Sequence, residues 1–379
     1  NLRAGLPAPL SGWVNNEEWR NSNGAWIRTE VWACLYPALV EKAIRFAYED
    51  ASVDHGLGEG TWAAIFVAAM ESAAFAISDI PALIGIGLGK IPEDCRVARS
   101  VRLVADAYRK GTPWQEVRQA LVEDSRDLGW FQAPANVGFV VLGLLYGEGD
   151  FKRSLLLAVD CGDDTDCTGA TLGALLGIRG GMAVIPEDWR AYIGDGIKSI
   201  CLTNGHGAFP TDCTQLTDCI CNLLPTTLRT EAEVVLAEAT DLSDAAPERF
   251  QGRDFARALA SRKPDSFTAE GLYVDALVEF EGRPEICPGG ALRGRVTLTP
   301  HTLPEQKNFC LRFFAPEGWQ VNGPRSLFTS AAHSAFTGHA SAAFTIVAGE
   351  RVEALNRVTL EISCPGRPTP LLLSLPILG

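Results

Sequence analysis

The chain has 379 residues and a formal net charge of −13, with 47% hydrophobic and 21% charged residues. This balance is typical of a folded globular protein and excludes a disordered or collagen-like chain. The excess of acidic residues argues against non-specific nucleic-acid binding, which needs clustered lysine and arginine. Because a domain usually takes roughly 100–200 residues, the length predicts two domains.

Signals for export or membrane insertion are not visible. The chain does not start with Met and has no signal-peptide pattern, so we interpret its start as processed or truncated. The most apolar run, Trp62–Ile77, is shorter than the ~20 residues of a spanning helix and contains Glu71, so we expect a core helix and no membrane role. The closest group among the eleven cysteines, Cys213, Cys219 and Cys221, fits no common zinc spacing. We therefore expect reduced thiols and a cytoplasmic protein.

The first part of the chain, residues 1–225, has the texture of a helical domain. Apolar residues recur there with helical spacing and predict helices over Phe46–Asp50, Trp62–Ile77, Val97–Arg109, Trp114–Glu123, Ala135–Tyr146, Phe151–Val159 and Thr168–Ile178. The sequence IPED occurs at Ile91–Asp94 and again at Ile185–Asp188, and proline followed by two acids is typical of a helix start.

The pattern changes after residue 225. Residues 226–268 are mixed in character, and we interpret them as a connector with some helix. Residues 269–379 are expected to form a β-sandwich, because short strands alternate there with turns that contain Pro and Gly. The expected strands are Leu272–Phe280, Ala291–Leu298, Phe309–Phe314, Ala342–Val347, Asn356–Ile362 and Leu371–Leu375. The fold class predicted is thus mainly α, a helical bundle followed by a β-sandwich.

The most informative segment is an acidic turn, CGDDTD at residues 161–166, which follows one apolar helix and opens another. Asp163, Asp164 and Asp166 place three carboxylates within four residues. Positions i and i+2 do not share a helix face, so Asp164 and Asp166 converge only if the backbone turns, which Gly162 would permit. A helix N-terminus offsets the repulsion only in part. The segment therefore predicts a bound cation, and oxygen ligands favour Mg²⁺, Ca²⁺ or Mn²⁺ over zinc.

Simpler explanations of this turn are weaker. A single aspartate would be a helix N-cap, but two further carboxylates make capping alone insufficient. An EF-hand is excluded, because Leu175 stands where its glutamate is required. Gly169, Gly173 and Gly177 leave one stripe of the next helix without side chains, at a cost of ~1 kcal/mol per glycine relative to alanine. We expect a second helix to pack closely on this stripe and to hold the turn rigidly.

Three other candidates are less specific. Glu71 is the sole charge in an apolar helix: it is either a buried acid with a raised pKa or a glutamate at the helix edge with a partner or solvent contact. Arg28 and Glu30, which lie among tryptophans, would either clamp an adenine or phosphate or form a surface ion pair. Asn136 is expected to cap a helix.

Here the sequence resembles the ADP-ribosylglycohydrolases, the family of dinitrogenase-reductase-activating glycohydrolase. GDDTDCTGATLGALLG, residues 162–177, looks like the C-terminal metal motif of that family, in which a GGDTDT-type turn opens a helix with small residues. Three further segments, covering residues 21–190 together with this motif, are similar to an NGAAMR-like segment, a TH…G…A segment and an IP…W segment. They are Asn23–Arg28, the Asp54–Gly60 stretch, and Ile185–Trp189.

The resemblance implies an all-α domain with two Mg²⁺ ions, or Mn²⁺, that binds ADP-ribose and cleaves its anomeric C–N or C–O bond. Asp164 and Asp166 match the two motif aspartates that bind metal. The residues that match positions near ADP-ribose are Asn23, Gly24, Arg28 and His55. The partner implied is a small molecule or an ADP-ribosylated substrate, with no nucleic acid and no membrane.

Two departures from the family pattern limit this reading. Cys167 stands where the motif usually has Thr, and a thiol is a poor ligand for a hard cation. The N-terminal acidic motif of the family, together with its early glutamate, is expected upstream of residue 1, and so are the catalytic residues. We therefore keep three hypotheses: a metal-dependent hydrolase of an ADP-ribosyl bond, a non-catalytic protein that binds ADP-ribose or a nucleotide, and a hydrolase of another ribosyl or glycosyl compound.

Overall fold

The chain forms two compact units. The structure, a computed structural model, describes residues 1–198, 209–231, 235–237, 245–260, 262–300, 307–329 and 340–379. One unit consists of Ser11–Ser261 and is helical, whereas the other combines Asn1–Leu10 with Arg262–Gly379 and is built of strands. The bounds of these two units, which follow from contacts in the structure, differ from the predicted division of the chain into residues 1–225, 226–268 and 269–379.

The helical unit contains every helix that the periodicity predicts. Its described helices are α1 (Glu30–Leu35), α2 (Val40–His55), α3 (Glu59–Ala73), α4 (Ile80–Leu88), α5 (Arg96–Arg109), α6 (Trp114–Asp124), α7 (Ala133–Tyr146), α8 (Phe151–Asp160), α9 (Thr165–Gly180), α10 (Glu187–Ile193), α11 (Cys213–Thr227) and α12 (Asp254–Ala260). Short 3₁₀ turns accompany them, among which η3 (Asn23–Ala25) matters for the site. Helices α1, α4 and α11 are additions to the predicted set, whereas α12 lies in the connector, where some helix is expected.

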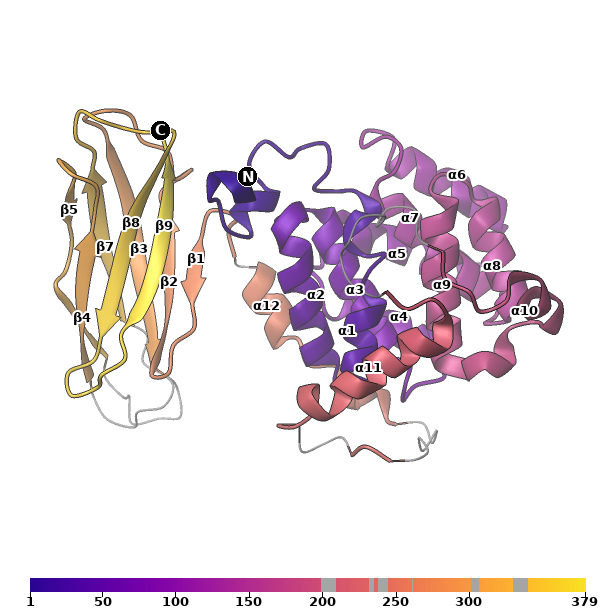
Figure 1. The fold of residues 1–379 in the computed structure, drawn as a ribbon. Helices are drawn as coiled ribbons and strands as arrows, with labels where there is room; N and C mark the ends of the chain where they lie inside the picture. Colours follow the sequence, from indigo (N-terminus) through magenta and orange to yellow (C-terminus); the bar gives the residue numbers. More distant parts are fainter. Residues whose placement is uncertain (199–208, 232–234, 238–244, 261, 301–306, 330–339) are drawn as a thin grey trace. The chain divides into compact units, whose positions relative to one another are not determined.

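Helices α3 and α7 form the centre of this unit (Figure 1). Both are apolar on all sides, as expected of helices that are surrounded by others. Every residue from Gly60 to Ala73 is buried, as is every residue from Ala133 to Leu145. The core helix expected from the most apolar run is thereby confirmed.

One described stretch, Thr165–Val184, is long and apolar enough to cross a membrane by length and composition alone. Core helices of soluble proteins pass the same test. In this structure Leu172, Leu175 and Leu176 of the stretch belong to the core of the helical unit.

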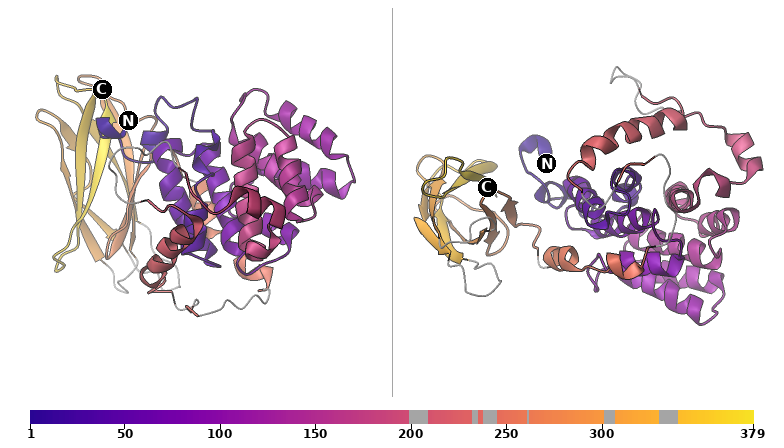
Figure 2. Two further views of the ribbon diagram at one scale, coloured as in Figure 1. Left: turned by 45° about the vertical axis from the view of Figure 1, so that its right-hand side comes forward. Right: turned by 90° about the horizontal axis from the view of Figure 1, so that it is seen from below.

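The second unit contains two antiparallel sheets, as predicted for a β-sandwich. One sheet has the strand order β1-β2-β3-β7-β5 and the other β6-β4-β8-β9. Figure 2 shows the strands of this unit, coloured orange to yellow, from two further directions. The strands are β1 (Phe267–Ala269), β2 (Val274–Phe280), β3 (Ala291–Pro300), β4 (Lys307–Phe314), β5 (Gln320–Asn322), β6 (Ser326–Thr329), β7 (Ala340–Val347), β8 (Leu355–Ser363) and β9 (Leu371–Leu378).

Burial alternates along these strands, because successive side chains of a strand point to opposite faces of the sheet. In β8, for example, Val358, Leu360 and Ile362 are buried, and the residues between them are not. The first ten residues of the chain belong to this unit as well: the Arg357 guanidinium of β8 donates a hydrogen bond to the Gly5 carbonyl.

The ten described cysteines are free thiols, as predicted. Cys213, Cys219 and Cys221 lie on α11 and are all exposed. Cys161 and Cys167, by contrast, are buried next to the acidic turn.

Candidate functional site

The acidic turn connects α8 to α9 through two residues in the left-handed region. Gly162 has φ +78° and Asp163 has φ +61°. Such values suit glycine, and among other residues aspartate and asparagine adopt them most readily. Asp164 then occupies the N-cap position of α9. The turn that the sequence predicts at Gly162 is thus present, and it extends to the next residue.

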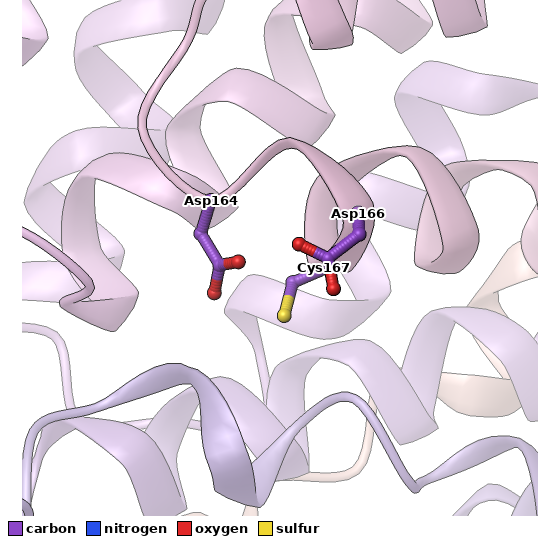
Figure 3. Close-up of side chains that lie close together, drawn as sticks. All are labelled: Asp164, Asp166 and Cys167. Carbon is purple, nitrogen blue, oxygen red and sulfur yellow. The ribbon is translucent and has the colours of Figure 1, made fainter. Parts of the chain in front are cut away.

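The turn gathers two carboxylates and one thiol. Ligand atoms of Asp164, Asp166 and Cys167 all lie within 4.8 Å of one another. Figure 3 shows the three side chains projecting toward one another from the first turn of α9. Asp163 does not join them, because its carboxylate accepts a hydrogen bond from the backbone N–H of Phe131 at 3.0 Å. Of the three aspartates in the turn, Asp164 and Asp166 therefore converge, as the sequence predicts for a turn at Gly162, and Asp163 does not.

Burial and charge act together on this cluster. Asp164 is 6% exposed, and its burial raises its pKa; the Asp166 carboxylate adds to this, whereas hydrogen bonds from Cys167 and Asn23 oppose it. Burial also raises the pKa of the Cys167 thiol, and the two carboxylates raise it further. Asp166 is exposed, so one side of the cluster is open to solvent. Without a cation, both shifts favour the protonated forms of Asp164 and Cys167.

Asn23 contacts the acidic turn directly, although 141 residues separate it from Asp164. Its amide Nδ2 donates to Asp164 Oδ2 at 2.6 Å, and its Oδ1 accepts from the indole N–H of Trp26 at 3.1 Å. Asn23 and Trp26 are fully buried. The indole fixes the orientation of the amide, which in turn fixes one oxygen of Asp164. A contact of Asn23 with substrate stays a prediction.

Asn136 holds the same aspartate from the other side. It lies inside α7 rather than at its cap, which is Gln132, so the capping role expected from the sequence is wrong. Its amide donates to the Gln132 carbonyl at 2.9 Å, and its Oδ1 accepts the backbone N–H of Asp164 at 3.3 Å. Asn136 is the one strongly polar residue in an otherwise apolar helix, and this signal could have pointed to it.

Backbone contacts pin the segment before η3 to the start of α7. Ser22 and Gln132 form an isolated antiparallel bridge. On either side of it, Asn23 N–H donates to the Phe131 carbonyl at 3.3 Å and Ala133 N–H donates to the Asn21 carbonyl at 2.8 Å. Since Phe131 also donates to Asp163, one short strand-like contact aligns η3, α7 and the acidic turn.

His55 ends α2 and lies between two polar partners. Its Nδ1 is 2.7 Å from Asp54 Oδ1, and its Nε2 is 3.0 Å from the Ser22 hydroxyl. In the neutral tautomer whose Nδ1–H donates to Asp54, Nε2 accepts a hydrogen bond from the Ser22 hydroxyl. Partial burial alone would raise the pKa of Asp54, but hydrogen bonds from His55 and Arg28 outweigh it and hold the pKa at about 2. His55 thereby anchors the segment that carries Asn23.

Arg28 is engaged by carboxylates. Its guanidinium donates to Asp50 Oδ2 at 2.7 Å, to Asp54 Oδ1 at 2.9 Å and to the Gly24 carbonyl at 3.0 Å. Of the two interpretations, the ion pair is present, with Asp50 and Asp54 rather than Glu30 as partners. A role of Arg28 and Gly24 in binding substrate stays a prediction.

Close packing around His55 requires glycine at Gly60. A Cβ atom there would lie 2.5 Å from His55 Cδ2 and 2.8 Å from the Ser22 carbonyl oxygen.

The glycine stripe of α9, formed by Gly169, Gly173 and Gly177, is packed less closely than predicted. Side chains of α8 cover Gly169 and Gly173, whereas a Cβ on Gly177 would meet no atom within 4 Å among the described residues.

Glu71 is a buried acid, the first of its two interpretations. It is 0% exposed, and burial together with nearby Glu30 raises its pKa well above the usual value. The Thr29 hydroxyl lies 3.0 Å from Glu71 Oε2. Its other oxygen, Oε1, has no hydrogen-bond partner among the described residues.

Comparison with known proteins agrees with the motifs. The family model of the ADP-ribosylglycohydrolases matches residues 1–205, more than half of the chain. No curated protein matches at a significant level. Among solved structures, a FixG-related protein from Vibrio parahaemolyticus matches at 4% identity and a TM-score of 0.23, over 28% of this chain and 94% of that one. A TM-score this low carries no structural argument.

The family match spans the pinned Asn23 segment, His55, the acidic turn and α9. Its range, residues 1–205, includes each segment on which the resemblance of the sequence rests. The chain therefore belongs to the ADP-ribosylglycohydrolase family, which is a family of glycosyl-bond hydrolases.

Proposed function

We propose that this protein hydrolyses an ADP-ribosyl bond, or a related N- or O-ribosyl bond, with the help of a divalent cation held by Asp164 and Asp166. The observation that carries the proposal is the convergence of these two carboxylates at a rigid turn. The chain that contains this turn belongs to a family of glycohydrolases. The expected substrate is a small molecule or an ADP-ribosylated group, with no nucleic acid or membrane involved.

The donor set supports a cation at this place. Two carboxylates as close as these repel each other unless a proton or a cation lies between them, and the buried one already has a raised pKa. A bound divalent cation would act as a Lewis acid, orient hydroxyl groups of the ribose and favour ionisation of a water molecule. The resemblance expects two Mg²⁺ ions, or Mn²⁺, and this number of ions stays a prediction.

The surrounding residues would keep the site preorganised. Asn23 and Asn136 hold Asp164 by its side chain and its backbone, respectively. Ligands that are already oriented by hydrogen bonds bind a cation without a further loss of conformational entropy. His55 supports the segment behind Asn23, with its ring set by Asp54 and Ser22.

Calorimetry with Asp164→Asn tests this proposal. The substitution keeps an oxygen to accept the Asn23 amide but removes the charge, so cation-dependent binding of ADP-ribose is expected to disappear. The matched control is Asp160→Asn, an exposed aspartate at the end of α8 four residues earlier, which is expected to bind as the unaltered chain does. Cation-dependent binding that survives unchanged in Asp164→Asn would contradict the proposal.

The presence of Cys167 in the motif supports one alternative hypothesis, in which the protein binds ADP-ribose but does not hydrolyse it. A thiol in place of a hydroxyl weakens the site for a hard cation. A time course of ADP-ribose release from an ADP-ribosylated peptide, measured in the same samples, distinguishes a binding protein from a hydrolase. Binding without release would indicate a binding protein, whereas release that depends on Asp164 would indicate the hydrolase.

A further inference from the structure

We infer that the cation site at the start of α9 takes a thiolate-binding ion of the Zn²⁺ class rather than Mg²⁺, with Cys167 as a ligand beside Asp164 and Asp166. The inference rests on the proposed function, because it concerns the identity of the cation at the same site. It starts from the chemistry of the three donors that the structure brings together.

The donor set does not fit a hard cation. Mg²⁺ and Ca²⁺ take oxygen ligands, and Mg²⁺ in particular requires a near-octahedral oxygen shell. Thiolate sulfur selects softer ions, and Zn²⁺ accepts sulfur and carboxylate oxygen in one site. Three protein donors with a fourth position left open is the arrangement of catalytic zinc sites, and Asp164, Asp166 and Cys167 supply three.

The distances suit a single ion of this class. With Zn–S of about 2.3 Å and Zn–O of about 2.0–2.2 Å, two donors of one tetrahedral ion lie roughly 3.3–3.7 Å apart. The three donor atoms already lie within 4.8 Å of one another, so modest side-chain rotations would close them around an ion. Asp166 is exposed and leaves a route for the ion to enter.

Cys167 differs from the other buried thiols in its surroundings. Cys161 donates to the Leu157 carbonyl at 3.3 Å, and Cys95 accepts the Ala98 N–H at the cap of α5. Each of these is satisfied by backbone. Only the cluster at Cys167 brings three ligand-type side chains together among the residues that the structure describes.

A second observation comes from the same face of α9. Thr171 lies one turn after Cys167, and side chains of a helix lean toward its N-terminus, here toward the cluster. Thr171 is 1% exposed, and no hydrogen-bond partner for its hydroxyl is found among the described residues. An unsatisfied buried hydroxyl one helical turn after the thiol is explained if the site holds a further polar group, such as a water on a bound ion.

The test uses Co²⁺, an optical probe for Zn²⁺ sites, added to the full chain after removal of metals in a non-thiol reductant. The unaltered chain is expected to develop a near-ultraviolet sulfur-to-cobalt charge-transfer band that Zn²⁺ abolishes and excess Mg²⁺ does not. Cys167→Ser and Asp164→Asn are each expected to lose the band. Cys161→Ser, which alters a neighbouring buried thiol outside the cluster, is expected to keep it.

Equilibrium dialysis then measures affinity in the same variants. Loss of the sulfur ligand in Cys167→Ser is expected to weaken Zn²⁺ binding by at least about tenfold. Cys167→Thr, which restores the hydroxyl usual in the family motif, is expected to shift preference toward Mg²⁺.

The outcomes separate this inference from the proposed function. Cation binding that needs Asp164 but gives no sulfur band, with Mg²⁺ preferred and Cys167→Ser unchanged, overturns the inference and leaves the proposed function standing. If no divalent ion binds in a manner that depends on Asp164, both are overturned. A cobalt band that persists in Cys167→Ser places the sulfur elsewhere and also overturns the inference.

Discussion

Glu71→Gln is expected to stabilise the helical unit at pH 8 relative to the unaltered chain, by up to about 1.4 kcal/mol for each unit by which burial raises the pKa of Glu71. Glu71 is completely buried in α3, with Glu30 nearby and with no hydrogen-bond partner for Oε1 in the part of the chain that the structure describes. Glutamine keeps the shape of the side chain and an oxygen for the Thr29 hydroxyl, but it cannot ionise.

The gain should depend on pH in a defined direction. Burial raises the pKa of Glu71 in the folded state, so the unfolded chain loses this proton at lower pH than the folded chain does. Below the unfolded pKa both states are protonated, and the group has no effect on stability. As the pH rises above that value, the folded state holds more protons than the unfolded one, and stability falls.

Urea unfolding of both proteins at pH 4 and pH 8 measures this effect. The unaltered chain should lose stability between the two pH values relative to Glu71→Gln, and the two curves should approach each other at pH 4. Thr29→Val, which removes the hydroxyl but not the acid, should keep the pH dependence. Equal stability of Glu71→Gln and the unaltered chain at pH 8 would mean that the carboxyl is not held neutral.

Gly60→Ala is expected to destabilise the helical unit by about 1–3 kcal/mol, the range found for overpacking. Alanine normally stabilises a helix interior relative to glycine. Here the added methyl group would overlap the His55 ring and the Ser22 carbonyl. Relief of that overlap moves the segment that carries Asn23, so cation binding should weaken as well.

Gly177→Ala is the matched control, since it is also a helical glycine. Its added methyl group meets no atom within 4 Å among the described residues, and a gain of roughly 0.5–1 kcal/mol is expected. Thermal unfolding should therefore show a lower stability for Gly60→Ala and a higher stability for Gly177→Ala. Cation titration should show weaker binding for Gly60→Ala only. A stabilised Gly60→Ala with normal binding would show that the packing around His55 is loose.

Much of the fold could be predicted because periodicity reports burial. The apolar runs of α3 and α7 and the alternating strands β2, β3 and β8 were visible in the residues themselves. Helix α11 was missed although Leu216, Ile220 and Leu224 recur in it with helical spacing. None of its residues is fully buried, and Pro225 lies inside it, so its pattern is weaker than that of the core helices. Strands β5 and β6 have three and four residues, which is too short for an alternation to be recognised.

The site was predictable only in part, for a related reason. A local motif identifies Asp164, Asp166 and the turn at Gly162. The direction of the Asp163 side chain depends on its φ of +61° and on a donor from Phe131, which the motif does not contain. The contact of Asn23 with Asp164 joins residues 141 positions apart, and no pattern in one sequence reports such a distance.

The membership of Asn1–Leu10 in the β unit has a consequence for how the chain folds during synthesis. Domains generally fold in the order in which the ribosome makes them. The helical unit, Ser11–Ser261, can fold once its own residues have emerged. Gly5, however, reaches its partner Arg357 only after 352 further residues have been made. Asn1–Leu10 is therefore ordered only after the strands of the β unit have been made, and until then it stays available to proteases or chaperones.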